Sequence, residues 1–269
     1  QDDLSGSLSR ILHAEMATVD LLGDGARSLV LGLETLSHFQ LPDTRGVFLM
    51  GPGVSGGISQ GLVFESEHAV DFLSPVVVEH AASGDWLFAG GCGAQRVWRL
   101  AVEPTSEALV ADQEIEFGND LGAWGCALAD GGDMDGDGLH ELVVGDGQER
   151  VWLVWGELLA DAVGVLNVEH LAFPIHVGIG GGGFGATIEA LGDLDGDGLA
   201  ELAVGSPCAE TSECQGGLGV FGGDGLRRFQ VVDDAAEFGS LLAGGFDATG
   251  DGVPDFIAGT RGSESFLFS

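Results

Sequence analysis

Acidic side chains are crowded into short, repeated stretches of this sequence. The segment GDMDGDGLHELVVG begins at Gly132, and near-copies read GDLDGDGLAELAVG and FDATGDGVPDFIAG. Two like charges a few ångströms apart repel by up to ~4 kcal/mol at an effective dielectric constant near 20. A cation bound between the carboxylates would offset this repulsion, so the repeated stretches are candidate metal-binding loops.

The spacing within the loops indicates which cation would fit. Counting from Asp133, carboxylates occupy positions 1, 3, 5 and 9, glycine permits a sharp turn at position 6, and the backbone carbonyl at position 7 can add a ligand. Several hard oxygen ligands on a flexible loop favour Ca²⁺ over Mg²⁺, which keeps fewer protein ligands in near-ideal octahedral geometry. The predicted ligands are Asp133, Asp135, Asp137, Leu139 and Glu141 in the first loop, Asp193, Asp195, Asp197, Leu199 and Glu201 in the second, and Asp247, Thr249, Asp251, Val253 and Asp255 in the third.

These loops differ from an EF-hand, which begins with the same spacing. An EF-hand needs a bidentate acid at position 12 and a helix on each side, whereas position 12 here is Val144, Val204 or Ala258, inside an apolar run typical of a strand. The loops therefore belong to β-hairpins. The two intact loops predict calcium sites, and the third, where Thr249 replaces a carboxylate, predicts a weaker one. A degenerate copy of the loop that begins at Asp20 is expected to bind no calcium.

Longer repeats carry the loops. Pairs of an apolar residue and glycine end hydrophobic runs, and their glycines are spaced by 58, 55, 60 and 54 residues. An aromatic–glycine pair also precedes each acidic cluster by nine residues, at Trp124, Phe184 and Phe238. The spacing predicts five units within one domain, at about residues 9–65, 66–121, 122–181, 182–235 and 236–269.

Each unit has the pattern of short strands. Runs of four to eight residues bounded by Gly and Asp, such as GATIEALGD and ELAVGSP, are typical of strands and turns. Four strands per unit, repeated radially, indicate an all-β fold: a β-propeller of about five four-stranded blades with calcium-binding hairpin loops. The last unit ends after its third strand, so we expect residues 2–8 to supply the fourth strand and close the ring. A larger ring with missing blades is the alternative.

Composition limits the partners. Acidic residues outnumber basic ones 43 to 9, the net charge is −34, and there is no lysine. Such a surface repels phosphate backbones and anionic lipid headgroups, so we expect no nucleic-acid partner.

The longest apolar run, residues 151–155, is too short to span a bilayer, which takes about 20 residues. The first ten residues have no apolar signal-peptide core, so a secreted protein would be the mature form, with Gln1 as a processed start.

The combined pattern resembles a known family. An aromatic–glycine pair, then D-x-D-x-D-G-x-x-[DE] nine residues later, then an apolar–glycine ending, is similar to the FG-GAP repeat of the integrin alpha-subunit propeller and its bacterial relatives. The resemblance is strong in units three to five and weak in units one and two. It implies that the loop residues named above ligate Ca²⁺ on one face of the propeller, and that the chain serves in adhesion.

The propeller fold also predicts the cysteine pairs. Strand ends carrying Cys92 and Cys126 would lie in adjacent blades on the face opposite the acidic loops, so we expect a bridge between them. Cys208 and Cys214 flank one loop and should pair locally. Disulfides are typical of oxidising, extracellular compartments.

The sequence leaves three functions open. The first is a non-enzymatic, calcium-binding adhesion or interaction module, secreted or on the cell surface, that binds a protein or glycan through the face opposite the loops. The second is a structural subunit that contacts copies of itself or other members of an extracellular assembly. The third, which we disfavour, is a calcium-dependent polysaccharide-active enzyme, since nine arginines and no lysine or tyrosine offer few catalytic candidates.

Overall fold

The computed structural model is built almost entirely of β-strands. It describes residues 10–21, 25, 27–36, 44–50, 62–64, 74–78, 84–90, 96–103, 108–117, 124–146, 150–161, 164–168, 173–176, 183–207, 215–233, 237–260 and 265–269. The strands within these ranges form five sheets that follow one another along the chain. The expectation of an all-β fold with four-stranded sheets is confirmed.

The first two sheets contain the N-terminal strands. The first sheet, in spatial order, comprises β1 (Arg10–Val19), β2 (Ser28–Leu36), β3 (Thr44–Met50) and β4 (Leu62–Phe64). The second comprises β5 (Ser74–Val78), β6 (Trp86–Gly90), β7 (Arg96–Glu103) and β8 (Ala108–Glu116), with β12 (Gly164–Asn167) added at its edge.

The remaining sheets contain the intact acidic repeats. The third comprises β9 (Ala127–Asp130), β10 (Leu142–Gly145), β11 (Arg150–Val154) and β13 (Phe173–His176). The fourth comprises β14 (Thr187–Gly192), β15 (Glu201–Ser206), β16 (Gly216–Phe221) and β17 (Arg227–Asp233). The fifth comprises β18 (Leu241–Phe246), β19 (Asp255–Gly259) and β20 (Ser265–Phe268).

Successive sheets pack face to face, as propeller blades do. The first strands of neighbouring sheets contact one another, in the pairs β1 and β5, β5 and β9, β9 and β14, and β14 and β18. In the fourth sheet every residue of β15 and β16 is buried, whereas most of the outermost strand, β17, is exposed. Antiparallel four-stranded sheets repeated in this way form a β-propeller architecture.

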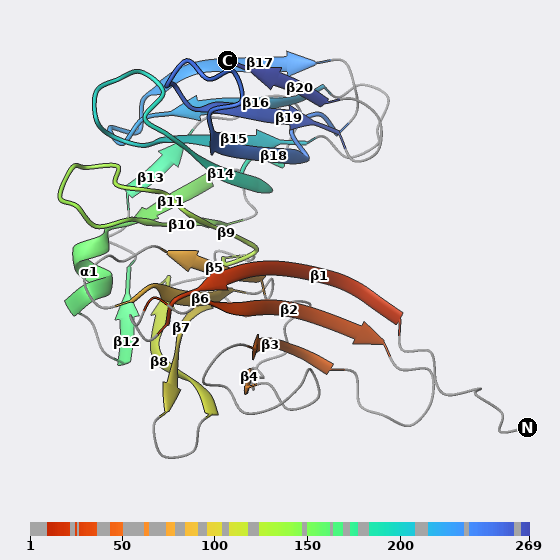
Figure 1. Cartoon of the computed structure of the whole chain (residues 1–269), viewed down its shortest axis with the longest axis vertical. Helices are drawn as coiled ribbons and strands as arrows, with labels where there is room; N and C mark the ends of the chain where they lie inside the picture. Colours follow the sequence, from red (N-terminus) through yellow and green to blue (C-terminus); the bar gives the residue numbers. More distant parts are fainter. Residues whose placement is uncertain are drawn as a thin grey trace, which may run out of the picture.

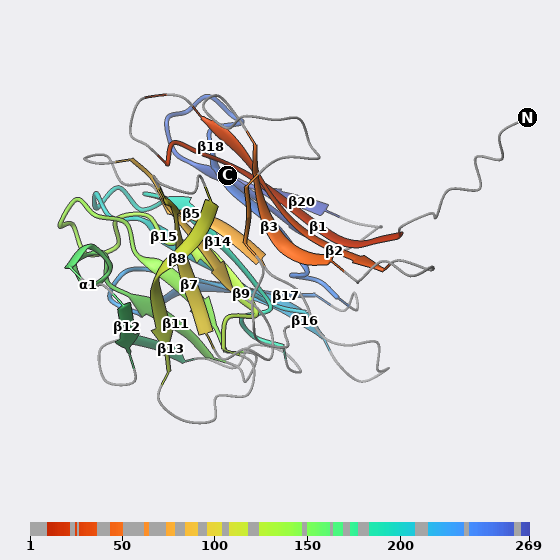
Figure 2. The ribbon, with the colours of Figure 1, turned by 90° about the horizontal axis from the view of Figure 1, so that it is seen from below.

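The first and the fifth sheets lie at different levels along the long axis of the molecule (Figure 1). Figure 1 shows β1–β4 at one end of the long axis and β18–β20 at the other. Figure 2, which looks along this axis from below, shows the sheets overlying one another. The predicted closing strand, residues 2–8, lies outside the described residues, and no described strand pairs with the outer edge of β20. Ring closure at five blades therefore stays a prediction.

The second sheet has one strand more than expected. After β11 the chain forms the short helix α1 (Gly156–Asp161), and β12 then pairs with β8 of the preceding sheet in a parallel arrangement. The side chain of Arg99 on β7 supports this connection, because its Nη1 donates a hydrogen bond to the Leu159 carbonyl at 2.7 Å. The second sheet thus has five strands, and the chain returns to the third sheet only at β13.

The aromatic–glycine pairs hold neighbouring sheets together. Trp124, Phe184 and Phe238 are each at most 1% exposed, in hydrophobic clusters with residues of two adjacent sheets. The glycine that follows each aromatic has a φ between 84° and 86°, a left-handed conformation that glycine adopts without steric cost. The aromatic ring of the dipeptide therefore fills the space between neighbouring sheets. Its glycine forms the turn that leads into the first strand.

The glycines that end the second strands allow a second close contact. Gly185 N donates to Gly205 O at 2.9 Å within the fourth sheet, and the third and fifth sheets repeat this bond at 3.1 Å. A Cβ on Gly145 would lie 2.6 Å from the Gly185 carbonyl oxygen in the next sheet, and one on Gly205 would lie 2.1 Å from that of Gly239. Since real Cβ atoms do not approach so closely, only glycine fits at these positions.

The cysteine predictions are only partly covered by the described residues. Cys126 is disulfide-bonded, and none of the described cysteines is free. Its predicted partner, Cys92, and the predicted local pair Cys208 and Cys214 lie outside the described residues. Both pairings stay predictions.

We expect the Phe184→Ala variant to destabilise the protein strongly. Removing a fully buried aromatic side chain typically costs about 3–5 kcal/mol, and here it would leave a cavity between the third and fourth sheets. Urea unfolding followed by tryptophan fluorescence would measure the loss. Phe229→Ala is the matched control, because Phe229 is 40% exposed and its loss should cost about 1 kcal/mol or less. Equal destabilisation by both variants would contradict this role for the aromatic–glycine pair.

Candidate metal centres

The three acidic loops occupy the same place in successive sheets. They connect β9 to β10, β14 to β15 and β18 to β19, the first and second strands of each sheet. Each loop has glycine at positions 4 and 6 with a φ between 78° and 89°. Two left-handed residues in one short segment wind the backbone tightly, which turns its N–H groups toward the loop's own carboxylates.

The aspartate at position 1 holds the centre of each loop. In the first loop, Oδ1 of Asp133 accepts a hydrogen bond from Gly136 N at 2.7 Å, and Oδ2 accepts one from Gly138 N at 3.1 Å. Asp193 and Asp247 make the same two bonds to the glycines of their loops. These N–H groups lower the pKa of Asp247, with Gly252 N as the largest cause, because they stabilise the ionised carboxylate.

The aspartates at positions 3 and 5 each use one oxygen to brace the backbone. Oδ1 of Asp135 accepts a hydrogen bond from Asp137 N at 3.1 Å, and Oδ1 of Asp137 accepts one from Leu139 N at 2.7 Å. Asp195 and Asp197 repeat this arrangement in the second loop at 3.2 and 2.9 Å. Among the described residues, no backbone N–H donates to the Oδ2 atoms of these aspartates in either loop. In the second loop the guanidinium of Arg228 lies near them.

The carboxylate at position 9 lies beneath the loop and is almost completely buried. Glu141, Glu201 and Asp255 are at most 1% exposed, and each accepts a hydrogen bond from the position-2 N–H at 2.6–2.7 Å. Burial raises the pKa of Glu141 to about 7, against the lowering effect of hydrogen bonds from Met134 and Gly156. Burial also raises the pKa of Glu201. A buried carboxylate beside further acids is costly to ionise unless a cation is close.

The structure brings together most, but not all, of the predicted carboxylates. Ligand atoms of Asp133, Asp135 and Glu141 lie within 4.8 Å of one another in the first loop, and those of Asp193, Asp195 and Asp197 do so in the second. Asp137 and Glu201 fall outside these groups. The carbonyl oxygens of Leu139, Leu199 and Val253 stay predicted ligands.

The third loop differs in the way that its sequence suggested. Asp247, Asp251 and Asp255 do not form such a group among the described residues. Thr249 at position 3 instead donates its hydroxyl to Asp247 Oδ1 at 3.5 Å and its backbone N–H to Asp255 Oδ2 at 2.9 Å. A hydroxyl replaces an anionic ligand, so the loop has the same winding with less charge to hold a cation.

A test of the fit to a cation comes from the buried glutamates. In the first loop, Oε1 of Glu141 accepts a hydrogen bond from Gly156 N at 3.3 Å. In the second loop, Oε1 of Glu201 is buried and has no hydrogen-bond partner in the described part of the chain. A buried carboxylate oxygen without a donor is unfavourable, and a hard divalent cation would satisfy it. The residues present therefore fit Ca²⁺.

The degenerate loop of the first sheet keeps a trace of the same structure. Oδ2 of Asp20 accepts a hydrogen bond from Gly25 N at 2.8 Å, the counterpart of the bond from position 1 to position 6 in the intact loops. Asp24 lies outside the described residues, and the prediction that this loop is empty is not tested.

Two neighbours of the loops were not foreseen from the sequence. His140 Nδ1 lies 3.0 Å from the carboxylate of Asp130, which also accepts a hydrogen bond from Gly132 N and so fixes the entry to the first loop. Arg228 on β17 lies against the second loop, 3.3 Å from Asp195. No local pattern identifies Arg228, because it is far from the loop in sequence.

Comparisons with known proteins agree with this architecture. A model of the FG-GAP repeat matches residues 184–209, which contain the second loop. Integrin alpha-X of Mus musculus is 31% identical over 182 residues, covering 62% of this chain and 14% of the integrin. Integrin alpha-5 of Xenopus laevis is 30% identical over 160 residues, covering 50% of this chain and 14% of the integrin. The matched part is thus a small fraction of each relative.

We expect the carboxyl of Glu141 to titrate near pH 7 in the absence of divalent cations. Its pKa in the folded protein lies above the ordinary value of 4.5, so its contribution to stability is lost as the pH rises from about 4.5 to about 7. NMR of the side-chain carboxyl carbon in EDTA would measure the midpoint. A Glu141 midpoint below pH 5 would contradict the burial argument.

Proposed function

Because this chain is an integrin alpha-like FG-GAP repeat protein, we propose that it is a calcium-binding, non-enzymatic interaction module of the adhesion type. The observation that carries this proposal is the repeated loop, with the same backbone-braced carboxylates over a buried acid in successive sheets. Calcium would neutralise each loop and fix the hairpin that it connects, so its role is structural.

The ligands proposed for calcium are those predicted from the sequence. Residues 133, 135, 137, 139 and 141 form the first site, and residues 193, 195, 197, 199 and 201 form the second. The third, with Asp247, Thr249, Asp251, Val253 and Asp255, is the weakest of the three, because Thr249 brings no charge.

The proposed setting is outside the cell, as a secreted or cell-surface module. Extracellular calcium modules bind with dissociation constants of about 0.1–1 mM, which millimolar calcium fills at least halfway. Among the described residues, no helix is long and apolar enough to cross a membrane. The proposed partner is a protein or a glycan rather than a nucleic acid, because the net charge of −34 repels phosphate. The longer connections proposed to meet it, within residues 34–45 and 206–217, lie mostly outside the described residues.

We expect calcium to raise the melting temperature of the protein. A ligand at 100 times its dissociation constant stabilises by about 2.7 kcal/mol, and 1 kcal/mol corresponds to about 2–4 °C in a chain of this size. Thermal unfolding in 2 mM and then 20 mM calcium, against excess EDTA, would therefore show a rise of several degrees.

Magnesium at the same concentrations and a matched pair of variants serve as controls. Asp135→Asn removes a proposed ligand and should reduce the calcium effect, whereas Asp161→Asn, an exposed acid on α1, should preserve it. The same melting temperature in calcium and EDTA would overturn the proposal.

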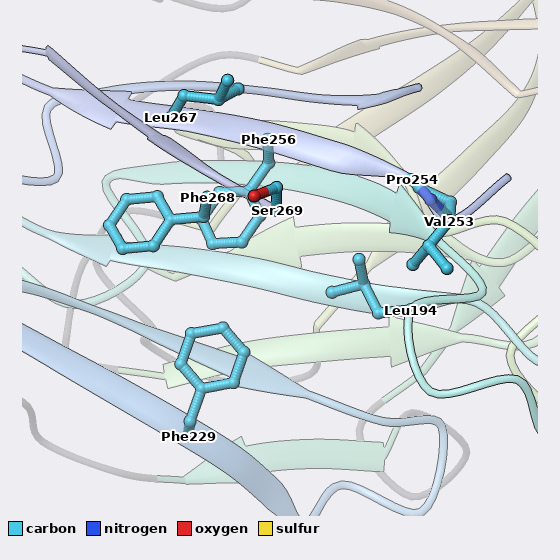
Figure 3. A pocket seen from close by; sticks show the side chains of 8 residues that line it. All are labelled: Leu194, Phe229, Val253, Pro254, Phe256, Leu267, Phe268 and Ser269. Atoms are coloured by element: carbon cyan, nitrogen blue, oxygen red, sulfur yellow. The ribbon is translucent and has the colours of Figure 1, made fainter. Parts of the chain in front are cut away.

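A second candidate function, a subunit of an extracellular assembly, is favoured by one surface. A pocket of about 440 Å³ lies between the fourth and fifth sheets, and Figure 3 shows its apolar lining. Phe229, Val253 and Leu267 around it are 40–52% exposed. It lies beside the edge of β20 with which no described strand pairs, and exposed apolar groups next to an open strand edge are typical of association sites.

Sedimentation velocity in 2 mM calcium separates the two candidates. An isolated interaction module should sediment as a monomer at all concentrations. An assembly subunit should form larger species that Leu267→Ser, within the pocket, dissolves and that Leu226→Ser, an exposed residue outside the pocket lining, leaves intact. A monodisperse monomer at high concentration argues against the assembly.

A polysaccharide-active enzyme is the remaining alternative. Hydrolysis or eliminative cleavage of any member of a panel of acidic and neutral polysaccharides, in calcium, would favour it over the proposed module.

A further inference from the structure

Arg228 is the cation that the folded chain itself places against the second acidic loop. Its guanidinium Nε lies 3.3 Å from Asp195 Oδ2, and Nη2 lies 4.0 Å from Asp197 Oδ2. Nη1 contacts both carboxylate oxygens of Asp224 at 3.1 Å. One arginine therefore bridges two proposed calcium ligands and a third acid that lies outside the loop.

The atoms that Arg228 approaches are those that a metal would use. Oδ1 of Asp195 and Oδ1 of Asp197 accept backbone hydrogen bonds, which leaves Oδ2 of each available to a cation. Arg228 lies at these two Oδ2 atoms. A guanidinium and Ca²⁺ in this position would repel each other and compete for the same oxygens.

The position of Arg228 follows from the short turn between β16 and β17. Gly222 N donates to Leu226 O at 3.2 Å, and Gly225 N donates to Gly222 O at 2.9 Å, so the chain reverses at once beside the loop. The guanidinium lies over Gly222, where an added Cβ would be 2.3 Å from Nη2. A larger residue at position 222 would displace the arginine.

The first loop provides an internal comparison. The backbone hydrogen bonds to its aspartates match those of the second loop. No arginine of the described residues, however, lies within ion-pair distance of Asp135 or Asp137. After β11 the chain forms α1 and leaves for the second sheet, so the third sheet has no tight hairpin of its own after its third strand. The β16–β17 turn contacts the first loop at its backbone, where Gly223 has no space for a Cβ against the Met134 carbonyl.

We propose that Arg228 is a built-in counter-cation that lowers the calcium affinity of the second loop relative to the first. Calcium must displace the guanidinium from Asp195 and Asp197, and Asp224 retains it at the side of the site. The two loops then fill at different calcium concentrations. Exposed ion pairs contribute little to stability, so the main effect of Arg228 is on cation binding rather than on folding. This inference rests on the proposed calcium function.

The test follows each loop separately in one protein. The backbone amide of Gly138 reports on the first loop and that of Gly198 on the second, since each is hydrogen-bonded to the position-1 aspartate of its loop. Both amides are followed by ¹H–¹⁵N NMR during titration with calcium chloride. In the wild type, we expect Gly198 to reach its midpoint at a higher calcium concentration than Gly138.

Arg228→Gln should shift the Gly198 midpoint about tenfold lower and leave the Gly138 midpoint unchanged. Arg227→Gln is the matched control, because Arg227 adjoins Arg228 on β17 and carries the same charge but makes no ion pair among the described residues. It should change neither midpoint. Arg228→Lys keeps the charge with weaker geometry and should shift the Gly198 midpoint by less than Arg228→Gln does.

The outcomes separate this inference from the calcium function itself. If Gly138 responds to calcium but Arg228→Gln leaves the Gly198 midpoint unchanged, the role of Arg228 is wrong and the calcium function stands. An equal shift in Arg227→Gln would also overturn it, because the effect would then be one of net charge. If neither amide responds to calcium in any variant, both proposals fail.

Discussion

The structure depends on the placement of a buried carboxylate under each acidic loop. Glu201 and Asp255 begin the second strand of their sheets, and Glu141 immediately precedes it. All three are buried and accept a hydrogen bond from the N–H of the residue at position 2. This contact fastens the loop to the strand that runs through the centre of the sheet. It also concentrates negative charge where water cannot screen it, so the contact that fastens the hairpin also creates the charge that the proposed cation would neutralise.

The opposite ends of the same strands are held by close packing at glycine residues rather than by charge. Gly145, the last residue of β10, and Gly205, the last but one of β15, have no space for a Cβ against the next sheet, and buried aromatic rings fill the gaps beside them. One end of each central strand is therefore set by electrostatics and the other by packing. Each repeat carries both the acidic loop and the glycine and aromatic residues, so each sheet has the same electrostatic contact at one end of its central strand and the same packing contact at the other.

Loops with nearly the same sequence acquire different properties from what surrounds them. Gly156 N, at the start of α1, satisfies the buried oxygen of Glu141, whereas the corresponding oxygen of Glu201 has no donor among the described residues. Arg228 approaches the second loop, and Thr249 removes a charge from the third. The repeat thus fixes how each loop winds, while the connection that follows the third strand changes its electrostatic surroundings.

The sequence by itself determined the parts that depend on local spacing. Glycine at position 6, acids at alternate positions and an aromatic–glycine pair nine residues upstream were sufficient to predict the hairpins, their acidic loops and an all-β repeat fold, because these features act within a few residues of one another. Only the tertiary structure decided that β12 joins the preceding sheet, that the buried Oε1 of Glu201 has no hydrogen-bond partner among the described residues, and that Arg228 contacts Asp195. Those contacts join residues far apart in the chain, and their geometry is set by how a turn or helix directs the next strand, which residue spacing does not encode.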